Sequence, residues 1–249
     1  MKSVLIGALS AVALLAVAPA ANAGSGYVGA AYTRAEVDTG FGDDDSDGYG
    51  IEGAWAFKAT PSLGVQIDAA FSDSDGSNNE AYGLTGHVNA RNDKYLVGGF
   101  VGLADIADET VWSVGVEGEK YFNNVTVAGA FGYANADDSD ADIWGVDSQV
   151  RYFLTDNFRI QGALGWAKVE AGPFDDNAWS AGVGGEYKFA AVPVSVYGGY
   201  TRTEFDDANI SSDAFTIGVR YNFGGSLKDR DRNGASLAGL SSLASRVGF

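Results

Sequence analysis

In residues 214–223 every second residue is apolar. The apolar positions are Phe215, Ile217, Val219, Tyr221 and Phe223, and the residues that complete the stretch are Ala214, Thr216, Gly218, Arg220 and Asn222. A repeat of two places successive side chains on opposite faces of a β-strand, so the stretch predicts a strand with one apolar and one polar face. A strand on the surface of a soluble core shows the same pattern, and the rest of the chain must decide between the two environments.

Similar alternation recurs along the chain and predicts an even number of strands. Twelve are expected, at 26–37, 48–58, 63–72, 80–91, 94–104, 110–122, 125–135, 142–153, 158–169, 178–189, 193–204 and 213–223. The stretch 48–58 is among the clearest, because Tyr49, Ile51, Trp55 and Phe57 all fall on one face. The stretch 26–37 alternates less cleanly, and its faces stay unassigned.

The first 23 residues have the three parts of a secretory signal peptide. Lys2 gives a basic start, an apolar run follows, and small residues lead up to Ala23, after which we expect cleavage. A retained membrane anchor is the alternative, but the apolar run is shorter than the ~20 residues that a helical span needs. The chain contains no cysteine, so the exported protein forms no disulfide. We therefore expect a cleaved signal peptide at 1–23, a strand-rich domain at 24–223 and a tail at 224–249.

The connections between the expected strands alternate between two kinds. Short ones fall at 59–62, 92–93, 123–124, 154–157 and 190–192, and longer ones at 38–47, 73–79, 105–109, 136–141, 170–177 and 205–212. The longer connections, with the residues that flank them, hold 22 of the 33 acidic residues and no Lys or Arg. Negative charge is therefore expected at one end of the domain. The predicted acidic rim includes Asp43, Asp44, Asp45, Asp47, Asp137, Asp138 and Asp140.

Aromatic residues recur in pairs on one face of five expected strands. The pairs are eight or ten residues apart: Tyr49 and Phe57, Trp112 and Phe122, Trp144 and Tyr152, Trp179 and Phe189, and Phe215 and Phe223. In a tilted strand this spacing spans roughly 20 to 26 Å along the axis of a barrel, close to the ~25 Å apolar band of outer-membrane barrels. The alternative, an aromatic core inside a soluble β-sandwich, leaves the equal spacing and the alternating loop lengths unexplained.

The last expected strand resembles the closing strand of bacterial outer-membrane β-barrels. The residues that carry the resemblance are Thr216, Gly218, Tyr221 and the terminal aromatic Phe223. The whole pattern resembles the porin-like families of Gram-negative outer membranes, which implies an all-β fold, a transmembrane antiparallel up-and-down barrel of about 12 strands. The resemblance also implies outer-membrane lipid and the barrel-insertion machinery as partners, and passive diffusion of small hydrophilic solutes as the function.

Charged residues on the inward faces are the candidate lumen residues. They are Glu52, Asp68, His87, Glu117, Glu119, Asp147, Arg151, Arg159, Glu186 and Arg220. A narrow water-filled pore is one interpretation, and opposite charges that pair across the lumen and fill it are the other. The second fits a non-conducting barrel that serves envelope stability, adhesion or surface antigenicity. In a pore, the acidic rim predicts a mild cation preference that fades as salt rises, and it disfavours nucleic acid. Solute identity and oligomeric state stay open.

Enzymatic and metal-binding functions find little support in the residues. His87 is the single histidine, and no serine motif or matching acid can be placed beside it, so we expect no catalytic site. The runs that begin at Asp43 and Asp229 resemble the start of an EF-hand loop, but the bidentate glutamate of position twelve is missing from both. Loose divalent-cation binding by the acidic clusters is the remaining metal hypothesis. We expect no dedicated metal site and no cofactor.

The tail departs from the outer-membrane pattern, because such barrels usually end at the aromatic residue of the last strand. Apolar residues recur at helical spacing in the tail and predict a short amphipathic helix over 235–247. The tail is expected to be disordered or weakly helical, and the periplasm, the membrane surface and the pore mouth are all open as its location.

Overall fold

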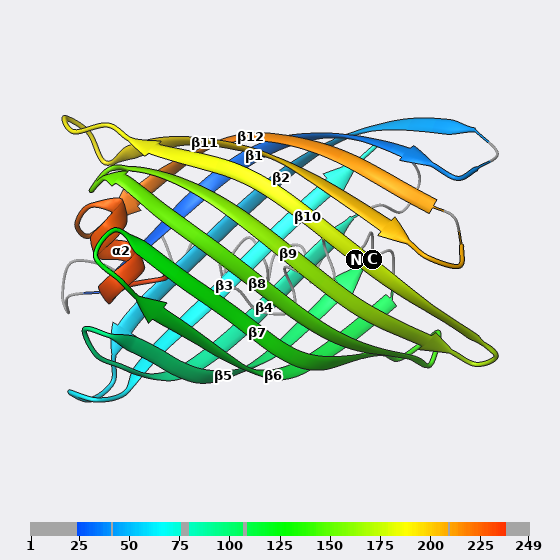
Figure 1. Cartoon of the computed structure of the whole chain (residues 1–249), viewed down its shortest axis with the longest axis horizontal. Helices are drawn as coiled ribbons and strands as arrows, with labels where there is room; N and C mark the ends of the chain where they lie inside the picture. The colour runs from blue at the N-terminus through cyan, green and yellow to red at the C-terminus, as the bar shows by residue number, and fades with distance from the viewer. Residues whose placement is uncertain (1–23, 41, 76–79, 107–108, 209, 238–249) are drawn as a thin grey trace.

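The computed structural model describes residues 24–40, 42–75, 80–106, 109–208 and 210–237. The predicted signal peptide, 1–23, lies outside the described residues. The strands are β1 Ser25–Asp38, β2 Asp43–Lys58, β3 Gly64–Ser74, β4 Ala81–Arg91, β5 Tyr95–Ile106, β6 Glu109–Tyr121, β7 Val125–Ala136, β8 Ala141–Thr155, β9 Phe158–Ala171, β10 Phe174–Lys188, β11 Val194–Phe205 and β12 Ile210–Phe223. One short helix, α2 Leu227–Asn233, follows β12 (Figure 1).

The twelve strands form a closed antiparallel barrel, as the sequence predicted. Each strand pairs with its neighbours in the chain, and β1 pairs with β12 from Gly26 opposite Phe223 to Asp38 opposite Ser211. Closure gives every strand two hydrogen-bonded neighbours. A sheet needs this in lipid, where no water is present to hydrogen-bond its backbone N–H and C=O groups. No helix among the described residues is long and apolar enough to cross a bilayer.

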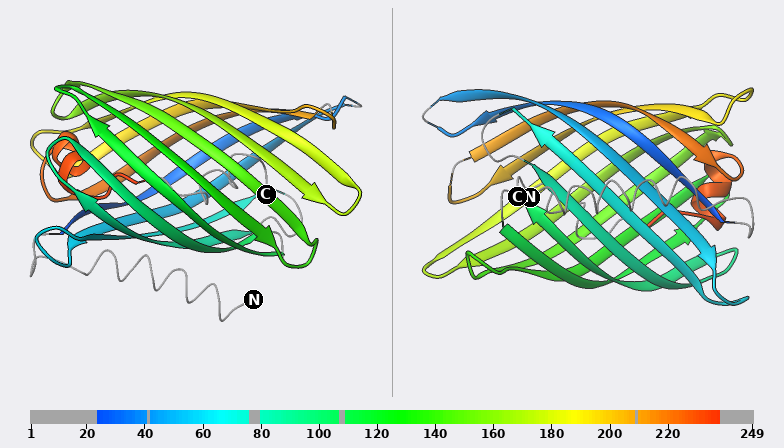
Figure 2. Two further views of the ribbon diagram at one scale, coloured as in Figure 1. Left: turned by 60° about the horizontal axis from the view of Figure 1, so that its bottom comes forward. Right: turned by 180° about the vertical axis from the view of Figure 1, so that it is seen from behind.

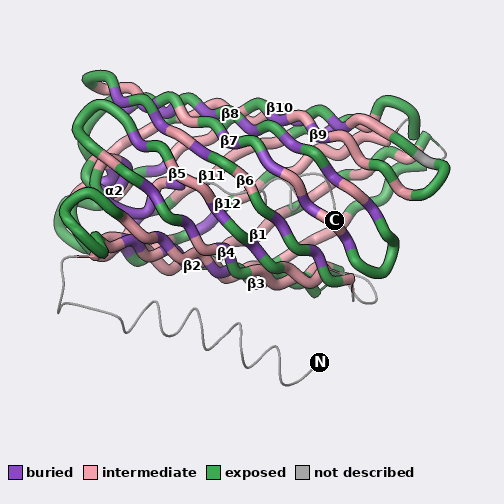
Figure 3. The backbone as a smooth tube through the Cα atoms, turned by 90° about the horizontal axis from the view of Figure 1, so that it is seen from below, coloured by how far each residue is buried: buried purple, intermediate pink, exposed green. Residues whose placement is uncertain are grey.

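The alternating side chains divide between the outer surface and the lumen. Phe215, Ile217, Val219 and Tyr221 on β12 are 52% to 65% exposed and face outward. Residues that pair across neighbouring strands share a face, so the partners of these side chains on β1 also face outward. Tyr27 and Gly29 on β1 pair with inward residues of β12 and face the lumen, which settles the faces of this strand. Buried and exposed residues alternate most regularly in β8, and Figure 3 shows buried and exposed stretches along the strands in view.

The predicted alternation of short and long connections is not seen between the strand ends, because the connections hold two to five residues at one end of the barrel and two to six at the other. We call the end that carries the turns after β2, β4, β6, β8 and β10 the short-turn end, and the opposite end the long-loop end. The names of the two ends follow the prediction. At the long-loop end the strands extend further than predicted, because the β1–β2 ladder continues to Asp38 opposite Asp43. The expected loop 38–47 therefore shrinks to residues 39–42. Asp43, Asp44, Asp45 and Asp47 belong to β2, whereas Asp137, Asp138 and Asp140 lie in the turn between β7 and β8.

Aromatic side chains contact one another near both ends of the barrel. Toward the long-loop end, the ring of Tyr133 lies 5.3 Å from that of Trp112 and 4.9 Å from that of Trp144. Toward the short-turn end, the ring of Tyr187 lies 5.3 Å from that of Phe189. Two belts of aromatic residues separated by an aliphatic band are the arrangement that membrane interfaces favour.

Candidate functional site

The chain reverses direction after β12 and re-enters the barrel at the short-turn end. Gly224 has a φ of 104°, and a Cβ there would lie 2.8 Å from Oγ of Ser25, so the reversal requires glycine on both conformational and steric grounds. Ser226 then caps α2, since its Oγ accepts a hydrogen bond from the Asp229 amide and the Asp229 carboxylate accepts one from the Ser226 amide. Figure 2 shows α2 at one end of the barrel in both views. We call residues 225–237 the plug segment.

The first half of the plug segment is bound to the wall by a buried arginine. Nη2 of Arg230 donates to the carboxylate of Glu186 on β10 at 2.7 Å, and Nη1 donates to the Asn222 side chain on β12. The guanidinium also lies over the ring of Tyr27 on β1, 4.8 Å from its centroid. Arg230 thus joins the plug segment to three strands.

Asp231 holds the opposite side of the helix. Its carboxylate accepts hydrogen bonds from Nη1 of Arg151 on β8 at 2.7 Å and from Oγ1 of Thr126 on β7 at 2.5 Å. Burial alone would raise the pKa of Asp231, but the positive charge of Arg151 and the two hydrogen bonds outweigh burial and lower this pKa. The carboxylate is therefore ionised at neutral pH and pairs with the wall.

The end of the plug segment reaches the remaining wall. Arg91 on β4 donates to the carbonyl of Gly234 at 2.9 Å, and the Ser236 amide donates to Oε1 of Gln66 on β3 at 3.0 Å. The hydroxyl of Ser236 donates to Glu119 on β6 at 3.0 Å. Because residues 230–236 contact strands from β3 to β12, this segment crosses the lumen.

The wall carries one ionic cluster around Glu186. Its carboxylate accepts from Arg159 on β9 at 3.0 Å and from Arg220 on β12 at 2.9 Å, in addition to Arg230. Arg220 also lies 2.8 Å from Glu52 on β2. These groups form a continuous chain of charges from β9 to β2.

Aromatic rings hold Arg220 in place within this cluster. Its guanidinium lies between two tyrosine rings, 4.4 Å from the centroid of Tyr27 and 3.8 Å from that of Tyr197. The ring of Tyr197 lies against Gly218, where a Cβ would come within 2.5 Å of Cζ. Gly218 therefore provides the room that the Tyr197 ring needs.

A second cluster lies on the facing part of the wall. Nδ1 of His87 is 2.9 Å from Glu117 on β6, and Nε2 is 3.1 Å from Asp68 on β3. Farther toward the short-turn end, Arg151 donates to Glu119 at 2.9 Å. The structure thus gives His87 two carboxylate partners, which the sequence could not place beside it.

All ten candidate lumen residues lie on the inward face, and nine of them fall into these clusters. Asp147, the tenth, is buried on β8 and lines a cavity of about 10 Å³ with Glu117, Glu119 and Arg151. A contribution of these residues to solute passage stays a prediction. Sequence reasoning missed Tyr27, Arg91, Gln66, Arg230, Asp231 and Ser236. For the plug segment one local signal was available, since Ser226 and Asp229 have the spacing of a capping box.

Each wall ion pair joins strands that are neighbours or next-nearest neighbours. Arg159 and Glu186 lie on adjacent strands, and the pairs of Arg220 with Glu52 and Glu186, of Arg151 with Glu119 and of His87 with Glu117 each skip one strand. The opposite strand of the barrel would be six positions away. The wall pairs among the described residues therefore run along the wall, and the plug segment makes the crossing.

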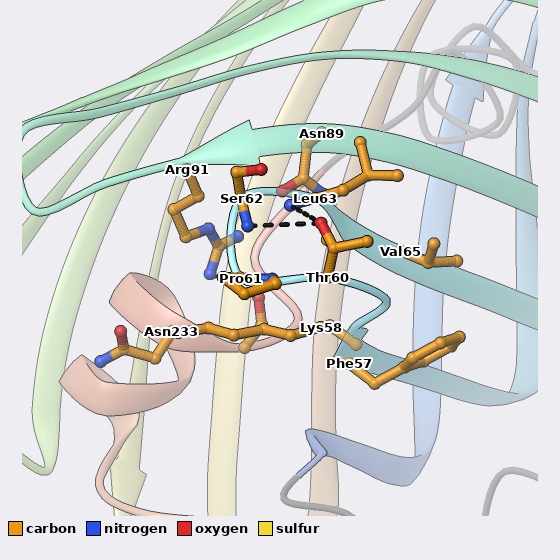
Figure 4. A pocket seen from close by; sticks show the side chains of 13 residues that line it. Phe57, Lys58, Thr60, Pro61, Ser62, Leu63, Val65, Asn89, Arg91 and Asn233 are labelled. Atoms are coloured by element: carbon orange, nitrogen blue, oxygen red, sulfur yellow. Dashed lines mark hydrogen bonds between the residues drawn. The ribbon is translucent and has the colours of Figure 1, made fainter.

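The plug segment packs closely against the barrel end. A cavity of about 30 Å³ lies between the turn after β2, Arg91 and Asn233. Figure 4 shows the side chains that line it. The hydroxyl of Thr60 organises this turn by accepting from the Leu63 amide at 3.1 Å. Together with the cavity beside Leu237, this space has room for only a few water molecules.

The described residues contain no group of three or more His, Cys, Asp or Glu side chains placed to hold a metal ion. The EF-hand-like run at 229–234 lies in and just after α2, where Asp229 caps the helix and Asp231 binds Arg151. The equivalent run at 43–48 lies in β2, where Asp45 pairs with Arg34 at 2.7 Å. Neither run adopts a calcium-binding loop.

Comparison with known proteins identifies the family. A model of the outer membrane protein beta-barrel domain matches residues 82–223, which is more than half of the chain. This chain belongs to that family of outer-membrane β-barrels. It is therefore a protein of the outer membrane. Among curated proteins, none matches the sequence.

Solved structures with the same fold include an outer membrane channel, a porin and the translocator domain of an autotransporter. An outer membrane channel from Pseudomonas putida F1 superimposes with a TM-score of 0.59 at 13% identity, over 82% of this chain and 97% of that one. The KdgM porin gives 0.54 at 10% identity, over 79% and 99%. The translocator domain of the autotransporter NalP from Neisseria meningitidis gives 0.54 at 13% identity, over 89% and 97%. At these identities the likeness shows the fold alone.

Proposed function

We propose that this barrel is a narrow channel through which small hydrophilic solutes diffuse passively, with a mild preference for cations. The observation that carries the proposal is the direction of the wall ion pairs. Side chains that interlocked across the lumen would make a permanently filled barrel. Among the described residues the wall pairs run along the wall, and the plug segment makes the crossing. No chemical step by this protein is part of the proposal, and no cofactor or metal is needed.

The acidic long-loop end supports the cation preference. At the acidic end the β1–β2 hairpin continues past the ring contact of Tyr32 with Tyr49 to Asp38 opposite Asp43. The longer connections of outer-membrane barrels are extracellular, so we place the short-turn end in the periplasm and the acidic rim outside. A rim of like charge concentrates counter-ions and repels anions. A structure of the KdgM porin is described as a complex with disordered oligogalacturonate, a carboxylate-bearing sugar. The acidic rim of this chain disfavours such a polyanion.

Planar-bilayer recording tests the channel function directly. The mature protein is refolded, its folded state is verified by heat-modifiable electrophoretic mobility, and its conductance and reversal potential are measured at two salt concentrations. We expect stable conductance with cation preference that fades as salt rises, because the screening length falls from ~30 Å at 0.01 M to ~3 Å at 1 M. Replacing all four aspartates in residues 43–47 by asparagine moves the cation-to-anion permeability ratio toward one.

A structural or surface barrel is the second candidate function, and the plug segment favours it. This function requires that a folded barrel stay silent under every condition that displaces the segment. In that case the acidic rim becomes the functional surface, as a contact for other cells, phage or cations. Either function involves outer-membrane lipid and the barrel-insertion machinery, which we propose as partners.

The residues of the proposed closing-strand signal lie on both faces of β12. Thr216 and Gly218 face the lumen, and Tyr221 faces outward toward lipid.

A further inference from the structure

The wall clusters stay paired when the plug segment is taken away. Glu186 loses Arg230 but keeps Arg159 and Arg220, at 3.0 and 2.9 Å. Arg151 loses Asp231 but keeps Glu119 at 2.9 Å. An unpaired buried charge is costly, so a lumen that needed the segment for pairing could not release it. The ion pairs within these clusters therefore do not depend on the segment. Arg91 on β4 loses the Gly234 carbonyl and the Ser236 hydroxyl, which are uncharged groups that water can replace.

The plug segment itself is held mainly by polar groups that water can replace. Charged and hydroxyl side chains make its contacts through Arg230, Asp231 and Ser236. Its buried apolar side chains are Leu227, Ala235 and Leu237. On leaving the lumen, the polar groups gain hydration in place of their wall partners, which offsets much of the free energy of these contacts.

The connection to the barrel is suited to a change of direction. Gly224 and Gly225 separate the last strand residue, Phe223, from the helix cap at Ser226. Two successive glycines give the backbone access to conformations that other residues avoid, and Gly224 already uses the left-handed region. The barrel hydrogen bonds end at Phe223, and rotation at the two glycines leaves them intact.

We propose that residues 225–237 are a displaceable gate, hinged at Gly224 and Gly225, that closes the short-turn end of the channel and opens it by leaving the lumen. This inference rests on the proposed channel function and adds its regulation. The closed state is the described one. In the open state the wall keeps its internal ion pairs, and water fills the space that the segment occupied.

A reversible crosslink tests the gate in the full-length chain, which contains no cysteine of its own. Oγ1 of Thr126 lies 2.5 Å from the carboxylate of Asp231, so the double variant Thr126→Cys/Asp231→Cys places two thiols where the closed segment meets the wall. The protein is oxidised with diamide, crosslinking is verified on a gel, and conductance is recorded before and after reduction with dithiothreitol. The single variant Thr126→Cys is the control for direct effects of these reagents.

We expect the oxidised double variant to conduct at least about tenfold less than the reduced one, because the reduced form has also lost a charged hydrogen bond worth a factor of about 10 to 100 in the closing equilibrium. The variant Arg230→Gln gives a second measurement and opens the channel without a crosslink. Its matched control is Asn233→Ala on the same helix, an exposed residue, and we expect this variant to behave like the unmodified protein.

The outcomes separate the gate from the channel. Equal conductance of the crosslinked and reduced forms would overturn the gate and leave the channel function standing. Silence of the folded protein in every form, including Arg230→Gln and the reduced double variant, would overturn the channel function and the gate together. Redox-dependent conductance in the double variant, absent from Thr126→Cys, supports both.

Discussion

Replacing Glu186 by glutamine removes the carboxylate that three guanidinium groups share. Arg159, Arg220 and Arg230 all donate to Glu186 within 3.0 Å, and the Ser195 hydroxyl donates to it at 2.7 Å. The glutamine side chain can still accept hydrogen bonds, but it carries no charge. The three buried cations then repel one another, and among the described residues Glu52 is the carboxylate that still pairs with the group, through Arg220.

The magnitude follows from the burial of this cluster. The Glu186 side chain is 2% exposed and the side chains of Arg159 and Arg220 are 13% and 12% exposed, so water screens their charges weakly. Breaking a buried ion pair from one side costs about 3 to 5 kcal/mol, and we expect the free energy of unfolding to fall by about this amount.

Urea unfolding of the refolded protein in lipid vesicles, followed by tryptophan fluorescence, measures this loss. The matched control is Glu204→Gln, which makes the same chemical change in an exposed pair, where Glu204 accepts from Arg202 at 2.7 Å. We expect no measurable change there, since water screens the pair. If both variants unfold at the same urea concentration as the unmodified barrel, the Glu186 cluster does not stabilise the wall and our account of it is wrong.

Two further predictions concern the fit of the Tyr197 ring and the acid limit of the gate. Gly218→Ala places a methyl group against the Tyr197 ring and should destabilise the barrel by about 1 to 3 kcal/mol in the same urea assay, whereas the outward Gly86→Ala, with open space around it, should be neutral. Because the pKa of Asp231 is lowered in the folded state, its pairing with Arg151 contributes fully above the ordinary carboxyl pKa of about 4 and is lost as pH falls through the lowered value. Conductance of the unmodified channel should therefore be insensitive to this group between pH 5 and 8 and rise in stronger acid. Asp231→Asn should lack that acid-dependent rise, and an identical rise in the variant would show that another group controls it.

The barrel was largely predictable from the sequence because its signal is local and repeated. Each strand carries its own alternation of side-chain polarity. In β12, for example, the outward Ile217 and Val219 are apolar, whereas the inward Thr216 and Arg220 are polar. Strand ends were harder to predict at the long-loop end, because aspartate and serine are poor strand formers. There the hydrogen-bonded pairing of β1 with β2 continues in spite of the low strand propensity of these residues, and Arg34 pairs with Asp45 across the two strands.

The plug segment was not predictable in the same way, because its partners are distant in the sequence. The predicted helix at 235–247 rested on apolar spacing, but α2 occupies Leu227–Asn233, and residues 235–237 are not helical. Residues 238–249 lie outside the described part of the chain. Burial of Arg230 and Asp231 depends on Glu186 and Arg151, which lie 44 and 80 residues away. No local pattern in 225–237 contains that information.

The wall and the plug segment hold different ion pairs, so one barrel can contain many buried charges and still act as the proposed channel. Charges that pair along the wall, such as Arg159 with Glu186, stiffen neighbouring strands whether the lumen is open or closed. Charges that pair with the plug segment, such as Arg151 with Asp231, favour the closed state alone. Substitutions of the first kind should therefore lower the unfolding free energy, and substitutions of the plug-segment side chains that bind the wall, Arg230 and Asp231, should change conductance at nearly constant stability. A variant set in which the two effects always moved together would show that the segment is a fixed part of the barrel.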